Sequence, residues 1–182
     1  VTGTKSLTDI HSEIDLEDLC NNIKKNQKAA LITQRGDDGN PDKKIKIDFQ
    51  PIGSLRGIYG NPLHFWSIFN NMITNSIKAL KSVEREEHKI TIKAYKDSDS
   101  KWLVTEFTDN GKGISDEHID NIFRPFYTSY LDSHYRGMGM GLPIVKDILE
   151  IDYDGTIKVD QANADGKGST TFFIKIPLKE LK

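Results

Sequence analysis

The sequence has a single cysteine, Cys20, so the chain cannot form an internal disulfide. It lacks any apolar run long enough for a transmembrane helix, and no signal peptide is visible at its start. The net charge is only −2, which gives no electrostatic reason to expect nucleic acid or an anionic membrane as the main partner. These absences favour a domain in a reducing, cytoplasmic setting that contacts neither nucleic acid nor the membrane directly.

The chain has 182 residues, which is enough for one domain with a sizeable core. Residues 1–13 are polar and aperiodic, and we interpret them as a linker remnant that precedes a folded domain over residues 14–182. The sequence starts with Val1 rather than methionine, so we expect it to be a piece of a longer protein.

Apolar periodicity predicts helices and strands that do not alternate strictly. The expected helices cover residues 15–26, 62–82 and 142–151, with a short one that follows Ser115 and ends near Ile122. The expected strands cover residues 29–33, 45–49, 90–96, 102–109, 156–161 and 171–176, and strands 90–96 and 102–109 should pair antiparallel. This mixture favours an α+β layer over a doubly wound parallel sheet.

The helix at residues 62–82 is apolar around most of its circumference, but it carries one narrow polar stripe. The stripe consists of Ser67, Asn71, Asn75, Lys78 and Ser82. Because such a helix is buried, the stripe should line a cavity that holds something polar. Asn75 offers an amide oxygen suited to Mg²⁺, and Lys78, about one turn further on, can meet phosphates as a point charge. The alternative is an amphipathic surface helix with solvated asparagines.

The stretch "FTDNGKGI" (107–114) ends a strand with Asp109 and then supplies Gly111 and Gly113. One interpretation is a carboxylate at the rim of a pocket that accepts a hydrogen bond from an exocyclic amine, with glycines that let a flat ring approach the backbone. The other is a simple turn, because Asp-Asn-Gly is a common turn sequence.

The stretch "GMGMGLPIV" (137–145) places Gly137, Gly139 and Gly141 just before a helix whose first turn contains Pro143. Free N–H groups at such a helix start favour an anion, and glycines let a phosphate chain lie against the backbone. No Gly-Lys-Ser/Thr follows, and Leu142 stands where the dinucleotide fingerprint requires glycine. A flexible glycine hinge is the alternative.

Four motifs in this order resemble the ATP-binding catalytic domain of sensor histidine kinases, within the ATPase superfamily that includes gyrase B, Hsp90 and MutL. "NNMITNSIKA" (70–79) is similar to the N box, "DNGKGI" (109–114) to the first glycine box, "IFRPFYTS" (122–129) to the F box and "GMGMGLPIVKDILE" (137–150) to the second glycine box. "GKGSTTFFIKIP" (166–177) resembles the closing strand of the family. The resemblance implies a two-layer α/β sandwich, with a mixed, mostly antiparallel sheet and helices on one face.

The resemblance also implies that ATP and Mg²⁺ bind between the N-box helix and a lid at residues 127–136. Asn75 is then the metal ligand, Asp109 the carboxylate that reads adenine, and Lys78 a phosphate contact. The implied nucleotide-binding residues are Asp109, Gly111, Gly113, Arg136, Gly137, Gly139, Gly141, Leu142 and Thr171. Thr171 is implied to lie near the adenine, although "GSTTF" can be aligned one residue either way.

The chain departs from the family at several positions. Tyr130 stands where the family often has a lysine, so a phosphate contact of the lid is either missing or supplied by Arg136 or Arg124. Asn61 replaces an acidic residue that usually precedes the N-box helix. Met138 and Met140 replace threonine and leucine.

The resemblance implies Asn71 and Lys78 as catalytic residues of a protein histidine kinase. The gyrase, Hsp90 and MutL branch uses a glutamate at the position of Asn71 to activate water, and an asparagine cannot act as a general base. Transfer to a histidine needs no such base, because neutral imidazole is already a nucleophile. An ATP hydrolase and a degenerate nucleotide-sensing module are the alternatives, the latter because of Tyr130.

The implied acceptor is a histidine on a separate dimerising hairpin, which we expect upstream of Val1, and a response regulator receiver domain is the indirect partner. None of the five histidines has the expected acceptor context; His11, followed by Ser12 and Glu13, comes nearest. We expect a cytoplasmic location, either as a free protein or as the cytoplasmic part of a membrane-anchored receptor.

Overall fold

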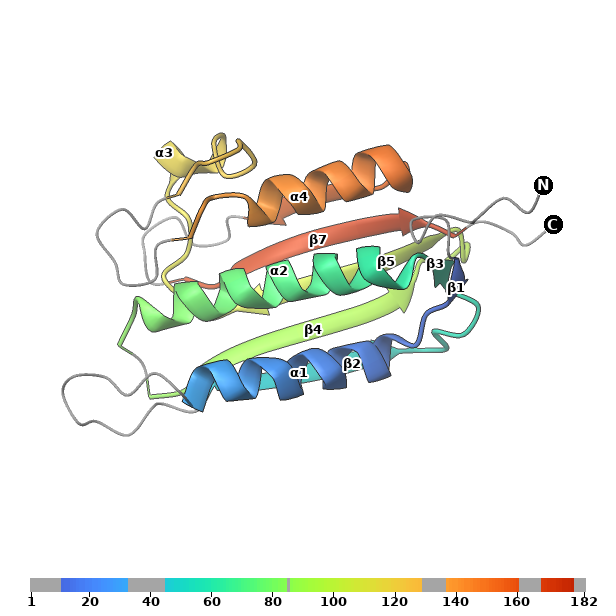
Figure 1. Cartoon of the computed structure of the whole chain (residues 1–182), viewed down its shortest axis with the longest axis horizontal. Helices are drawn as coiled ribbons and strands as arrows, with labels where there is room; N and C mark the ends of the chain where they lie inside the picture. The colour runs from blue at the N-terminus through green and yellow to red at the C-terminus, as the bar shows by residue number, and fades with distance from the viewer. Residues whose placement is uncertain (1–10, 33–44, 85, 129–136, 161–167, 179–182) are drawn as a thin grey trace, which may run out of the picture.

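A mixed sheet of five strands forms one layer of the fold. The computed structural model describes residues 11–32, 45–84, 86–128, 137–160 and 168–178 (Figure 1). The strands of the sheet are β2 (Ile45–Ile52), β4 (His88–Lys96), β5 (Trp102–Asp109), β6 (Thr156–Asp160) and β7 (Thr170–Pro177). Their spatial order is β2-β4-β5-β7-β6, in which β2 and β4 are parallel and the other pairs antiparallel.

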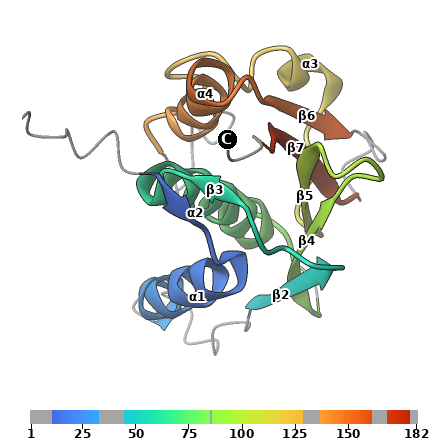
Figure 2. The same ribbon diagram turned by 90° about the vertical axis from the view of Figure 1, so that its right-hand side faces the viewer.

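Helices cover one face of this sheet, as the end-on view of Figure 2 shows. They are α1 (Leu16–Ile32), α2 (Pro62–Lys81) and α4 (Gly141–Asp147), and a π-helical turn at Ile148–Asp152 continues α4. A short helix, α3 (Asp116–Ile119), follows β5, and β1 (Ser12–Glu13) pairs antiparallel with β3 (Tyr59–Gly60). The expected α+β sandwich, with a mostly antiparallel sheet and helices on one face, is confirmed.

The core lies between the sheet and α2. Alternate residues of β4 point toward the helices, and Ile90, Ile92 and Ala94 are fully buried. On α2, Phe69 packs edge-on against Phe107 of β5, with ring centroids 5.1 Å apart. The central helix thus packs on the sheet with α1 on one side and α4 on the other, as Figure 2 shows.

The ends of α2 are set by local side-chain chemistry. Asn61 caps the first turn, because its Oδ1 accepts a hydrogen bond from the N–H of Leu63 at 2.9 Å, and Pro62 occupies the first helical position. At the other end, the hydroxyl of Ser82 donates to the carbonyl of Ala79 at 2.8 Å. These caps fix the length of α2 and therefore the place of its polar stripe along the sheet.

The structure corrects two assignments. The strand expected at residues 29–33 is wrong, because α1 continues to Ile32; Lys28, Ala29, Ala30 and Leu31 are strong helix formers that extend the preceding helix. Ser12–Glu13, assigned to the linker, forms β1. Within the described part of the chain, no helix is both long and apolar enough to cross a membrane.

Candidate functional site

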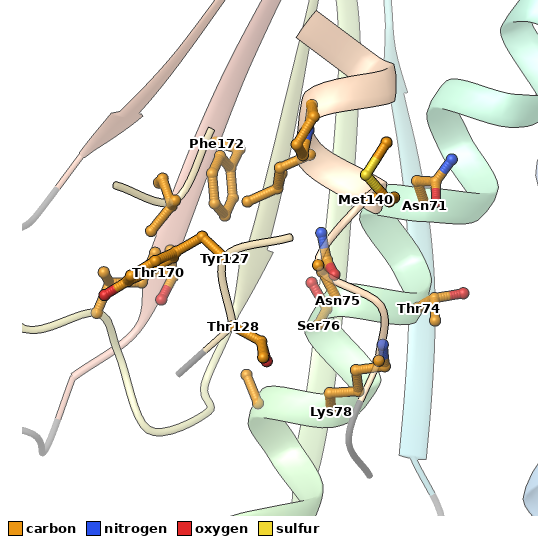
Figure 3. A pocket seen from close by; sticks show the side chains of 18 of the residues that line it. Asn71, Thr74, Asn75, Ser76, Lys78, Tyr127, Thr128, Met140, Thr170 and Phe172 are labelled. Atoms are coloured by element: carbon orange, nitrogen blue, oxygen red, sulfur yellow. The ribbon is translucent and has the colours of Figure 1, made fainter. Parts of the chain in front are cut away.

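A cavity of about 290 Å³ opens between α2, the end of β5, the start of β7 and the start of α4 (Figure 3). Asn71, Thr74, Asn75, Ser76, Lys78 and Ala79 of α2 form one wall. Thr170 and Phe172 of β7, together with Tyr127, lie across from that wall. Residues from all four sequence motifs and from the closing strand, distant along the chain, therefore line one cavity.

Asp109 ends β5 at the bottom of the cavity and is only 3% exposed. Its Oδ1 accepts a hydrogen bond from the backbone N–H of Gly111, and its Oδ2 accepts one from the hydroxyl of Ser76, both at 3.0 Å. Burial raises the pKa of Asp109 to about 6, and these two donors act in the opposite direction. The carboxylate keeps lone pairs free for a donor group of a bound molecule.

Asn75 presents an unsatisfied amide to the site. Its Nδ2 is buried without a hydrogen-bond partner, which is uncommon in a folded protein and calls for a ligand or solvent. One turn earlier, Asn71 is tied to its own helix, because its Nδ2 donates to the carbonyl of Ser67 at 2.8 Å. The two asparagines of the stripe thus differ: Asn71 is engaged with the protein and Asn75 is available.

The three glycines of the "GMGMG" run make room for specific neighbours. A Cβ at Gly137 would overlap the ammonium group of Lys78, and one at Gly141 would come within 3.1 Å of Asn71 Oδ1. Gly139 has a φ of +67°, and a Cβ there would lie 2.5 Å from the carbonyl oxygen of Tyr127. The run is therefore packed against α2 and the F-box segment. A flexible hinge, the alternative interpretation, does not require such close packing.

We expect Gly139→Ala to destabilise the protein and to weaken nucleotide binding. A left-handed backbone costs an alanine about 1–2 kcal/mol, and its methyl would also push Tyr127 away from the cavity. Gly53→Ala is a matched control, because Gly53 has a φ of +72° with no atom within 4 Å of its Cβ position. Thermal unfolding and ATP titration of both variants measure the difference; equal losses in both would contradict the packing argument.

The structure places Thr170 on the cavity, and Thr171 does not line it. Thr170 pairs in register with Asp109 and is buried, whereas the hydroxyl of Thr171 lies 3.0 Å from that of Thr108 on the other face of the sheet. Adjacent strand residues point to opposite faces, so the choice between the two threonines is settled by register. The assignment of Thr171 to the site is corrected to Thr170.

The other expected site residues divide into three groups. Gly113, Gly137, Gly139, Gly141 and Leu142 line the cavity together with Asn71, Asn75, Lys78 and Asp109. Gly111 does not line the cavity, but its backbone N–H donates a hydrogen bond to Asp109. Arg136 and Tyr130, with the rest of residues 129–136, lie outside the described residues, and so does most of the expected lid.

Sequence reasoning missed several residues of the site. Ser76 was overlooked because it follows Asn75 on the apolar side of α2. Lys112 lines the cavity between the two glycines of "GKG", and burial lowers the pKa of its ammonium group. Tyr127, expected only as the first residue of the lid, also lines it, and its hydroxyl lies 2.5 Å from Nδ1 of His118. The position of Lys112 between two glycines that were expected at the site is a signal that could have identified it.

The comparisons with known proteins agree with this geometry. Residues 60–180 match the family described as histidine kinase-, DNA gyrase B-, and HSP90-like ATPase. The chain is 31% identical over 136 residues to the sensor histidine kinase ZraS of Salmonella typhi, which covers 75% of this chain and 26% of the relative. It is 28% identical over 143 residues to the autoinducer 2 sensor kinase/phosphatase LuxQ of Vibrio parahaemolyticus, over 78% of this chain and 16% of the relative.

Solved structures share the fold. The catalytic domain of histidine kinase ThkA has a TM-score of 0.70 at 20% identity, with 94% of this chain and 99% of that chain covered. The mycobacterial sensor histidine kinase MprB has a TM-score of 0.70 at 18% identity, with 94% and 100% covered. The chain spans about a quarter of the length of the ZraS relative. It therefore belongs to the histidine kinase-, DNA gyrase B- and HSP90-like ATPase family, as an ATP-binding domain of the sensor histidine kinase type.

Proposed function

We propose that this chain binds ATP with Mg²⁺ and donates the γ-phosphoryl group to a histidine on a separate dimerisation and phosphoacceptor hairpin. The observation that carries the proposal is the convergence of a buried carboxylate, an unsatisfied amide and a lysine on one cavity walled by glycines. Asp109 accepts from the exocyclic amine of adenine, and Thr170 borders the same end of the cavity. Lys78 and the glycine run receive the triphosphate.

The residues present fit a magnesium ion. An amide oxygen is a hard, neutral ligand, and Mg²⁺ usually keeps several waters and binds through substrate phosphates. Because Nδ2 of Asn75 has no hydrogen-bond partner, its amide can present the oxygen to an ion without breaking a protein hydrogen bond at that nitrogen. When bound, the ion neutralises charge on the phosphates. Asn75 holds it, and Lys78 adds a second positive charge at the same wall.

The lining of the cavity supports phosphoryl transfer over hydrolysis. Among the described residues that line it, Asp109 is the only carboxylate, and both of its oxygens already accept hydrogen bonds from the protein. Asn71 has an amide where a hydrolase of this superfamily needs a base. A neutral imidazole attacks phosphorus without a general base, so positioning and charge neutralisation suffice for the proposed reaction.

The proposal includes the acceptor hairpin and a response regulator receiver domain, which takes the phosphoryl group from the histidine of the hairpin. It also includes a cytoplasmic location. Among the histidines described, His11 is exposed next to β1 and His88 is buried at the start of β4. His64 and His118 are partly buried. None of these lines the cavity, which supports an acceptor outside this chain.

Labelled ATP distinguishes the three functions. We expect the isolated chain to form no acid-labile phosphoprotein with γ-labelled ATP and Mg²⁺, and the parent protein with its hairpin to form phosphohistidine. Rapid phosphate release by the parent protein without any labelled protein would favour the hydrolase, and ATP binding by the parent protein without either product would favour the nucleotide-sensing module. Stoichiometric label on His11 of the isolated chain would contradict the proposed separate acceptor.

A further inference from the structure

Ser76 connects α2 to the end of β5 at the base of the cavity. Its side chain is 2% exposed, and its hydroxyl donates to Oδ2 of Asp109 at 3.0 Å. The two residues are 33 positions apart in the chain, so this bond joins the N-box helix to the first glycine box. Asn75, the neighbour of Ser76, belongs to the polar stripe of α2. Ser76 lies outside that stripe, and its hydroxyl has a different partner.

The bond matters because the carboxylate is buried. A buried charge needs hydrogen-bond donors, and Asp109 has one from Gly111 on Oδ1 and one from Ser76 on Oδ2. Each carboxylate oxygen has about two acceptor sites. The two protein donors therefore fix the carboxylate from both sides and leave its remaining lone pairs for a group inside the cavity.

We propose that Ser76 is a positioning residue that selects adenine through Asp109: its hydroxyl keeps Asp109 charged and oriented as an acceptor for the exocyclic amine. The inference rests on the proposed binding of ATP in this cavity. Ser76 itself acts on the carboxylate, and the loss of its hydroxyl removes one of the two donors that hold the acceptor in place.

The surrounding charges do not replace this donor. The other charged residues among the described lining are Lys78 of α2 and Lys112 of the loop after β5; β7 contributes only Thr170 and Phe172, and the α4 residues that line the cavity are uncharged. On β4, the register partner of Asp109 is the apolar Ile90. Because burial raises the pKa of Asp109 to about 6 and Ser76 opposes that rise, removal of the hydroxyl shifts the pKa further upward.

The test compares wild type and Ser76→Ala with ATP and with purine riboside triphosphate, which lacks the 6-amino group. Affinities are measured by titration calorimetry at pH 6, 7 and 8. We expect Ser76→Ala to bind ATP severalfold more weakly at pH 7, because more of Asp109 is then protonated and the carboxylate loses a donor that orients it. The deficit should shrink at pH 8, and purine riboside triphosphate should bind equally to both proteins. Ser98→Ala, in the exposed turn between β4 and β5, is the control for a serine-to-alanine change.

Other outcomes overturn the inference. Equal weakening of both nucleotides, without dependence on pH, means that Ser76 supports the helix and not the carboxylate. Unchanged ATP affinity in Ser76→Ala means that Gly111 alone positions Asp109. Failure of the wild-type protein to bind either nucleotide is a different result, because it overturns the proposed function and with it this inference.

Discussion

Replacing Asp109 with asparagine is expected to weaken ATP binding about tenfold or more and, at pH 7, to stabilise the empty protein. The carboxylate is the proposed acceptor for the adenine amine, and a hydrogen bond to a charged group accounts for the loss. In the asparagine variant, the side-chain oxygen accepts the hydrogen bond from the N–H of Gly111, so the NH₂ group faces the amine of adenine. Both of these groups are donors, and they cannot form a hydrogen bond with each other. GTP, whose base presents a carbonyl at this position, should bind weakly to the wild type and gain relative to ATP in the variant.

The stability gain follows from the raised pKa of Asp109, which is about 6 against an ordinary value of 3.8. Between these two pH values the folded state holds more protons than the unfolded state, so stability falls as the pH rises from about 4 to 6. At pH 7 the buried charge costs about 3 kcal/mol by this linkage. Asparagine carries no charge, so the variant should gain up to that amount at pH 7 and little at pH 4.

Urea unfolding of the empty protein at pH 4 and pH 7 measures the stability, and calorimetry with ATP and GTP measures the binding. Asp160→Asn, at an exposed position that ends β6, is the matched control and should change neither quantity. If Asp109→Asn binds ATP as the wild type does, Asp109 does not read adenine. If the variant is less stable than the wild type at pH 7, the hydrogen bonds of the carboxylate stabilise the fold by more than its buried charge costs, which contradicts the prediction.

Asn75→Ala is expected to abolish phosphoryl transfer while leaving the melting temperature of the empty protein nearly unchanged. The buried Nδ2 of Asn75 has no protein partner, so its removal breaks no hydrogen bond at that atom and relieves an unsatisfied group. The loss falls on the bound state, in which the amide holds the metal ion. ATP affinity should therefore fall more in the presence of Mg²⁺ than in EDTA.

Asn70→Ala, on the same helix, is expected to show the opposite behaviour. Oδ1 of Asn70 accepts a hydrogen bond from Nε2 of Gln27 on α1 at 3.0 Å, and Asn70 does not line the cavity. That variant should lose about 1 kcal/mol of stability but retain phosphoryl transfer. The melting temperature and the labelling rate of both variants test the contrast. Transfer at the normal rate by Asn75→Ala would rule out the metal-binding assignment.

Much of the fold and of the α2 wall could be predicted because the signals are periodic and local. Alternating residues such as Ile90 and Ile92 mark β4, and the polar stripe that contains Asn71 and Asn75 marks the face of α2 that lines the cavity. The end of α1 was missed because the apolar pattern of a short run is compatible with a helix or a strand; the helix propensity of its alanines and leucine, which the pattern ignores, extends the helix.

The remaining details of the site depend on pairing between distant segments. "GSTTF" does not specify which threonine faces the helices; the register of β7 against β5 does, and it places Thr170 next to Asp109. Ser76 belongs to the buried side of α2, among apolar residues such as Met72 and Ile73, and its partner lies on another element. A sequence pattern that records only helix faces cannot show such a bond.

A crystal structure of the chain with Mg²⁺ and a non-hydrolysable ATP analogue tests the central claim most directly. We expect the adenine amine within hydrogen-bond distance of Asp109, the phosphates along Gly137–Gly141 beside Lys78, and the ion in contact with the side-chain oxygen of Asn75. Adenine bound away from Asp109, or phosphates that do not approach the glycine run, would contradict the account even if the chain bound ATP tightly.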